Sequence, residues 1–174
     1  MSRDADAKKI ADAVERLGGE LEVLVNNAGI FRAAPFLDTK IREEWEEMIA
    51  TNLTGTFLTT YRLMPALLRS KRPHLFNILS VAARAGFPWN AGYGASKWGA
   101  RGLTETLRAE LGDRLRVTAV YPGATDTDSW EGAPFPYDRA KMLRPGPWPP
   151  RSSARGRRRR LRPRSSSRPP GAVG

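Results

Sequence analysis

Tyr93 and Lys97 form the residue pair in this sequence that is best suited to proton chemistry. On a helix, residues four apart lie on one face, so the Lys97 ammonium can approach the Tyr93 phenol. A nearby positive charge favours the phenolate and should lower the pKa of Tyr93 from about 10. The spacing therefore predicts a general acid or base that works closer to neutral pH.

Three further polar groups accompany this pair. Ser80 precedes Tyr93 by thirteen residues and follows an apolar segment that we interpret as a strand. A serine hydroxyl at a strand end can hydrogen-bond a carbonyl oxygen, on which negative charge develops when hydride attacks the carbon. Asn52 and the turn Asn26-Asn27-Ala28-Gly29 complete the set. Together these residues predict a reductase active site.

In type, order and spacing, these residues resemble the short-chain dehydrogenase/reductase family over about positions 4 to 143. A lone Tyr-x-x-x-Lys is a weak motif, whereas several motifs in the correct order rarely coincide by chance. The resemblance implies hydride transfer between a nicotinamide dinucleotide, NAD or NADP, and a small carbonyl or alcohol substrate. It also implies a homo-oligomer in which the helices expected over residues 41–69 and 93–111 contact a second subunit.

The resemblance implies a role for each matching residue. Tyr93 would exchange a proton with the substrate oxygen, and Lys97 would lower the Tyr93 pKa and bind the nicotinamide ribose. Ser80 would hold the substrate oxygen, and Asn52 would bond the backbone locally and hold a water that relays protons. The expected catalytic residues are thus Asn52, Ser80, Tyr93 and Lys97, and the expected cofactor-binding residues are Asn26, Ala28, Gly29, Tyr93, Lys97, Pro122, Gly123 and Thr125.

Simpler structural interpretations exist for the same residues. Asn26 and Gly29 tolerate unusual backbone angles and could merely form a turn after a strand. Ser80 could cap a strand end, and Tyr93 could pack on a neighbouring tryptophan. The joint spacing favours the catalytic interpretation. Residues 85–89 and 130–137 would then shape an apolar substrate pocket.

One part of the family pattern is not found before the Asn-Asn-Ala-Gly turn. The family carries a glycine-rich turn between its first strand and helix, where the pyrophosphate binds, and a second strand that reads the ribose. In this chain Gly18 and Gly19 follow a helical pattern instead. We therefore expect the first β-α-β half of the dinucleotide fold to be missing. An inactive fragment or pseudoenzyme is an alternative to an active oxidoreductase.

The positive charge is concentrated at the end of the sequence. Residues 144–174 contain ten arginines and no acidic residue, and 26 of these 31 residues are Arg, Pro, Ser or Gly. Such a composition cannot bury enough apolar surface to offset its ordering entropy, so we predict disorder. The tail could contact nucleic acid weakly and non-specifically, be an inert solvated end, or result from a reading-frame change. We divide the chain into a catalytic domain, 1–143, and a basic tail, 144–174.

Cysteine and histidine usage excludes several kinds of site. The sequence has no cysteine, so it has no disulfide, thiol nucleophile or cysteine metal site. His74 is the sole histidine and cannot build a zinc site alone; we interpret it as a surface residue at the start of a strand. We expect no metal. Neither a signal peptide nor an apolar run of about 18 residues is visible, which predicts a cytoplasmic protein without a membrane span.

Apolar periodicity predicts alternating helices and strands. We expect helices over residues 5–17, 41–69 and 93–111 and strands over residues 21–25, 75–79 and 116–121. This alternation is typical of a parallel sheet with right-handed crossovers. The fold class is therefore α/β: a partial, doubly wound, Rossmann-type sheet without its first strands, followed by a disordered tail.

Overall fold

The computed structural model describes residues 4–131, 133 and 135–146. Its main elements are α1 (Asp4–Arg16), β1 (Val23–Asn26), α2 (Ile41–Met48), α3 (Gly55–Arg69), β2 (His74–Ile78), α4 (Ala91–Leu111) and β3 (Arg116–Val120). The ends of the three strands, of α1 and of α4, the start of α2 and the end of α3 lie within two residues of the positions expected from the sequence. Gly18 and Gly19 follow α1 with φ angles of 111° and 74°, as expected where glycine ends a helix.

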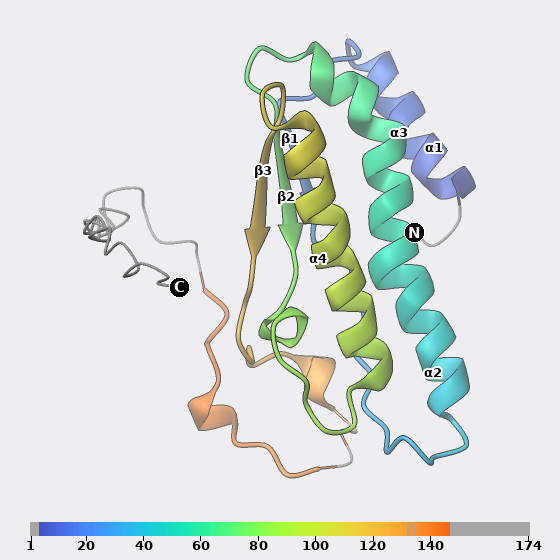
Figure 1. Cartoon of the computed structure of the whole chain (residues 1–174), viewed down its shortest axis with the longest axis vertical. Coiled ribbons are helices and arrows are strands. Elements are labelled where there is room, and N and C mark those ends of the chain that lie inside the picture. The colour runs from blue at the N-terminus through green and yellow to red at the C-terminus, as the bar shows by residue number, and fades with distance from the viewer. Residues whose placement is uncertain (1–3, 132, 134, 147–174) are drawn as a thin grey trace, which may run out of the picture.

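The three strands form a parallel sheet in the order β1-β2-β3 (Figure 1). Leu24, Leu75 and Val117 point to one face, where they form a buried core with leucines of α3. Partly buried apolar residues of α1 and α4 pack against the same core. The prediction of a partial Rossmann-type α/β fold is confirmed, and within residues 4–131 these helices cover one face of the sheet.

Val23 and Val25 lie on the opposite face of the outer strand β1 and are 45% and 52% exposed. Side chains alternate between the two faces of a strand, so the burial of Leu24 and the exposure of its neighbours follow from one pattern. None of the helices described for this chain covers Val23 or Val25.

The predicted single helix over residues 41–69 is interrupted. Ile49–Thr54 forms a π-helical segment between α2 and α3. A π turn contains one more residue than an α turn, and such turns are frequent at functional sites. Asn52, in the centre of this segment, is only 2% exposed. The interpretation of residues 41–69 as regular α-helix is therefore wrong over six residues.

His74 is buried rather than at the surface. It is 8% exposed, and its Nε2 lies 2.8 Å from Thr118 Oγ1 on β3. Arg116 Nε donates a hydrogen bond of 2.9 Å to His74 Nδ1, and burial and the Arg116 charge lower the His74 pKa. The surface interpretation is wrong because the parallel register places Arg116 directly beside His74.

Two further predictions from the sequence concern metal sites and membrane spans. No three His, Cys, Asp or Glu side chains within them gather as a metal site requires. None of the helices they form combines the length and apolarity needed to cross a bilayer. Residues 147–174, most of the predicted basic tail, lie outside the described part, so the division into a domain and a tail stays a prediction.

Candidate active site

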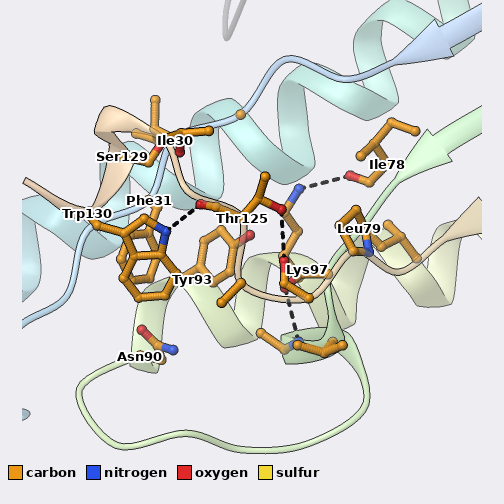
Figure 2. Close-up of a pocket in the computed structure, with 18 of the residues that line it drawn as sticks. Ile30, Phe31, Ile78, Leu79, Asn90, Tyr93, Lys97, Thr125, Ser129 and Trp130 are labelled. Atoms are coloured by element: carbon orange, nitrogen blue, oxygen red, sulfur yellow. Dashed lines mark hydrogen bonds between the residues drawn. The ribbon is translucent and has the colours of Figure 1, made fainter. Parts of the chain in front are cut away.

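Residues from several elements line one cavity of about 370 Å3 at the carboxyl end of the sheet. Parallel strands end at the same edge, so the segments that follow β1, β2 and β3 meet there. The start of α4 closes the cavity from the side (Figure 2). Of the residues predicted for the site, those that line the cavity are Gly29, Ser80, Tyr93, Lys97, Pro122, Gly123 and Thr125.

Three predicted site residues do not line this cavity. Asn26 and Ala28 line a separate, smaller cavity of about 150 Å3 beside the end of β1. Asn52 is buried behind the loop that follows Gly29. The structure therefore brings Ser80, Tyr93 and Lys97 together at one cavity and places Asn26 and Asn52 outside it.

Lys97 lies beside Tyr93 as predicted, with its Nζ 5.7 Å from the centroid of the Tyr93 ring. Lys97 is 7% exposed, and its ammonium donates a 3.0 Å hydrogen bond to the carbonyl of Ile78. Burial lowers the pKa of Lys97 to about 8. This pair comes from one turn of α4, so its geometry follows directly from the sequence spacing.

The pKa of Tyr93 differs from the expectation. Burial raises it, and a hydrogen bond with Ser80 acts in the opposite direction without cancelling that effect. The predicted lowering is wrong for this structure because removing the phenolate from water outweighs the hydrogen bond with Ser80. Tyr93 is thus held in its protonated form, which suits a proton donor.

Ser80 begins a short 3-10 turn, Val81–Ala83, directly after β2. Its backbone is extended, with φ −170° and ψ 162°, and its Oγ accepts a 3.1 Å hydrogen bond from the backbone N–H of Ala82. The strand-end cap that the sequence suggested is therefore present. The cap uses one lone pair of Oγ, and the hydroxyl also takes part in the hydrogen bond with Tyr93.

Asn52 bonds a distant loop rather than its own helix. Its Oδ1 accepts from Ile30 N at 2.8 Å, and its Nδ2 donates to Ile30 O at 2.9 Å and to Ser96 Oγ at 3.1 Å. Ser96 Oγ in turn donates to Tyr93 O at 2.8 Å. The expectation of a local backbone bond is wrong, and Asn52 instead ties the loop after β1 to the start of α4.

Gly29 suits this arrangement. A Cβ at position 29 would lie 3.1 Å from Asn52 Oδ1 and 3.6 Å from Lys97 Nζ. The first distance is tighter than ordinary contact. Glycine therefore allows the loop to approach Asn52 and Lys97 closely, which explains its place after the two asparagines.

Asn26 belongs to a polar network inside the fold. Its Nδ2 lies 2.8 Å from both Thr60 Oγ1 and Asn77 Oδ1, and Asn77 donates to Thr104 Oγ1 at 2.8 Å. This network joins β1 and β2 to α3 and α4 below the cavity. Sequence reasoning missed Asn77 and Thr104, although a polar residue within the apolar strand segment 75–79 was a usable signal.

Aromatic rings form one wall of the cavity. Phe31 contacts Tyr93 edge to face at a centroid distance of 5.0 Å and Trp130 at 5.2 Å. The Trp130 indole donates a 2.9 Å hydrogen bond to Thr125 O (Figure 2). Phe87 and Trp130 come from the segments expected to shape an apolar pocket, and both line it. Sequence analysis missed Phe31 as a residue of the cavity wall, although its position two residues after Gly29 was a usable signal.

Comparisons with known proteins identify the family of this chain. Residues 1–134 match the sequence profile described as short chain dehydrogenase. The chain is 41% identical over 124 residues to trans-4-hydroxycyclohexanecarboxylate dehydrogenase of Sinomonas cyclohexanicum, covering 71% of this chain and 47% of that protein. It is 38% identical over 128 residues to a 3-oxoacyl-(acyl-carrier-protein) reductase of Thermotoga maritima, covering 73% of this chain and 52% of that protein.

Solved structures give the same result. The oxidoreductase yciK from E. coli superposes with a TM-score of 0.74 at 26% identity, covering 82% of this chain and 58% of that one. ElxO with NADP bound gives a TM-score of 0.68 at 29% identity, covering 74% of this chain and 52% of that one. The chain spans about half the length of the curated relatives named above. By its sequence, its fold and the residues around its cavity, the chain belongs to the short chain dehydrogenase family.

Proposed function

We propose that this protein is a nicotinamide-dependent oxidoreductase that interconverts a carbonyl compound and an alcohol. The convergence of Ser80, Tyr93 and Lys97 on one cavity is the observation that carries the proposal. A buried phenol, a hydroxyl donor and a lysine are the groups needed to deliver a proton to a carbonyl oxygen. The names of the relatives, which are dehydrogenases and reductases, support it.

The residues around the cavity fit the nicotinamide end of a dinucleotide. Lys97 uses one ammonium proton on Ile78 O, which leaves two donors for ribose hydroxyls. Gly123 leaves open space, since a Cβ there would meet just Leu143, at 3.9 Å. The bound NADP of ElxO supports NAD or NADP as the cofactor. When bound, the nicotinamide would supply or accept the hydride.

Each protein group has a defined task in this proposal. In reduction, Tyr93 donates its phenolic proton to the carbonyl oxygen, and the Ser80 hydroxyl hydrogen-bonds the same oxygen. The raised pKa of Tyr93 keeps that proton in place at neutral pH. The Lys97 ammonium then stabilises the phenolate that remains, through space at 5.7 Å from the ring. Asn52 positions the loop and α4 around these groups.

We also propose a homo-oligomer that uses α3 and α4. Phe57 and Tyr61 stack on the surface of α3 at a centroid distance of 5.9 Å and are 47% and 61% exposed. Trp98 on α4 is 47% exposed. Aromatic residues are enriched in protein interfaces, which supports a subunit contact on these helices. The cytoplasmic location and weak nucleic-acid contact stay predictions from the sequence.

The test is carbonyl-dependent oxidation of NADH or NADPH, measured at millimolar cofactor with a panel of small ketones. Tyr93→Phe should lower turnover at least ~100-fold, because it removes the transferable proton and keeps the ring. Tyr61→Phe is the matched control, since it removes the hydroxyl of an exposed tyrosine of α3 and keeps the ring that the proposed subunit contact would use. Turnover that is undetectable with both cofactors, or equal in wild type and Tyr93→Phe, would contradict the proposal.

A further inference from the structure

Lys97 carries an amine that is largely removed from water and has no acidic neighbour in the cavity. It is 7% exposed, and neither aspartate nor glutamate is among the residues that line the cavity. Burial alone lowers the pKa of Lys97 to about 8. A buried ammonium without a counter-ion is costly, so the neutral amine is favoured. The neutral amine has a free electron pair, which makes it a nucleophile.

Space next to the Lys97 nitrogen is kept open by the loop after β1. Nζ donates a hydrogen bond to Ile78 O, 3.0 Å away. A Cβ at position 29 would lie 3.6 Å from Nζ, so the lack of a side chain at Gly29 leaves room beside the nitrogen. Gly29 and Lys97 line the same cavity, and Figure 2 shows Lys97 next to Tyr93. A small electrophile in the cavity therefore has a route to the amine.

Two hydroxyl groups accompany the amine. The Tyr93 ring centroid lies 5.7 Å from Lys97 Nζ, and burial raises the pKa of Tyr93, so the phenol keeps its proton. Ser80 forms a hydrogen bond with Tyr93. A protonated phenol beside a neutral amine is the pair that imine formation needs, because the amine attacks a carbonyl carbon and the carbonyl oxygen must leave as water.

We propose that Lys97 captures small aldehydes as a reversible imine, with Tyr93 transferring the protons. The nitrogen bonds to the aldehyde carbon, and the carbonyl oxygen takes a proton from Tyr93, which regains one from the nitrogen. The resulting hydroxyl then leaves as water with a second proton, carried from the nitrogen by Tyr93 in the same way. A C=N bond replaces the C–O bond, one water is released, and nothing is oxidised or reduced.

This capture is a second activity and does not rest on the function proposed above. It uses Lys97 as a nucleophile, whereas the oxidoreductase uses Lys97 as a hydrogen-bond donor to the nicotinamide ribose. The two uses exclude each other, so capture belongs to the chain without bound cofactor. An aldehyde would then block the site until hydrolysis of the imine releases it.

The test exposes the 174-residue chain, without nucleotide, to millimolar propanal at pH 7 for timed intervals. Excess sodium borohydride in the same buffer then reduces the imine to a stable secondary amine and consumes the remaining aldehyde. The α-amino group of the chain also reacts near neutral pH and is counted separately. Peptide mass spectrometry compares Lys97 with the lysines that are exposed, which are Lys8, Lys9, Lys40, Lys71 and Lys141.

Lys97 should be labelled at least about tenfold faster than the mean of the exposed lysines. A fall in pKa from 10.5 to about 8 raises the neutral fraction of an amine at pH 7 about 300-fold, and restricted access to the cavity offsets part of that gain. In urea that unfolds the chain, the preference for Lys97 should disappear, because burial is its source. This comparison needs no variant.

Variants assign the steps to particular residues. Tyr93→Phe should slow labelling of Lys97 at least about tenfold and leave the exposed lysines unchanged, because it removes the transferable proton. Tyr61→Phe, at an exposed tyrosine of α3, is the matched control and should change neither rate. Lys97→Met should abolish labelling at position 97. Thermal melts of each variant confirm that it is folded.

Equal labelling of Lys97 and the exposed lysines in the folded chain would overturn the proposal, and so would a preference that persists in urea. An unchanged Lys97 rate in Tyr93→Phe would also overturn it, because the protons would then come from water. Selective labelling without cofactor-dependent turnover would contradict the proposed oxidoreductase function alone. Turnover without selective labelling would contradict this inference alone.

Discussion

Replacing Asn52 with leucine is the most informative test of how the site is assembled. The change removes all three side-chain hydrogen bonds that join Asn52 to Ile30 and Ser96. Each is expected to contribute about 0.5–1.5 kcal/mol net, so the free energy of unfolding should fall by about 2–4 kcal/mol. Leucine has the same branched arrangement of side-chain heavy atoms and is somewhat bulkier, so the substitution leaves no cavity.

The effect should be local as well as global. Without Asn52, the N–H and C=O of Ile30 lose their partners, and the loop after β1 should open more often. Hydrogen exchange measured by mass spectrometry should therefore speed up in peptides that cover residues 26–35. Urea unfolding followed by circular dichroism gives the global free energy.

Asn27→Ala is the matched control, because Asn27 is an exposed asparagine of the same turn. It should change the free energy of unfolding by less than about 0.5 kcal/mol. A wild-type stability and exchange pattern in Asn52→Leu would refute the argument that Asn52 holds the loop against α4.

Three other predictions concern Lys97, the cofactor and the tail. Burial lowers the Lys97 pKa from 10.5 to about 8, so from about pH 8 to 10.5 the unfolded chain binds a proton that the folded chain lacks. The free energy of unfolding in urea, taken as wild type minus Lys97→Met, should therefore rise with pH across that window by up to about 3 kcal/mol. A difference that does not change with pH would contradict the burial of the Lys97 ammonium. The 174-residue chain should bind NADH or NADPH only weakly, because its sequence has no glycine-rich pyrophosphate turn after a strand; a low-micromolar dissociation constant from cofactor fluorescence would disprove this. Truncation after Leu143 should leave the midpoint of thermal unfolding unchanged and abolish retention on a DNA column, since ten arginines are removed. Retention of the untruncated chain should fall steeply with salt. A large loss of stability on truncation would show that the tail is part of the fold.

The features predicted well from sequence are those encoded over short distances. The spacing of Tyr93 and Lys97 fixed their common face of α4, and apolar periodicity located the three strands, α1 and α4. Gly18 and Gly19 marked the end of α1 because the left-handed backbone there suits glycine. Each of these signals is contained within a few consecutive residues.

The features predicted poorly depend on residues far apart in the chain. Asn52 bonds Ile30 across 22 positions, and His74 meets Arg116 through the sheet register. The direction of the Tyr93 pKa shift depends on how much water the assembled cavity excludes, which local spacing does not encode.

The π-helical segment Ile49–Thr54 sets the rotational phase of α2 relative to α3. A π turn spreads one extra residue over nearly the rotation of an α turn, so the flanking helices stay close to the phase of one continuous helix. The Trp45 backbone and Met48 therefore still face α4, where a Cβ at Gly92 would lie 3.0 Å and 2.6 Å from them. Deleting one residue from this segment should accordingly restore regular α-helix, and it should disturb the position of Asn52 more than the position of α2.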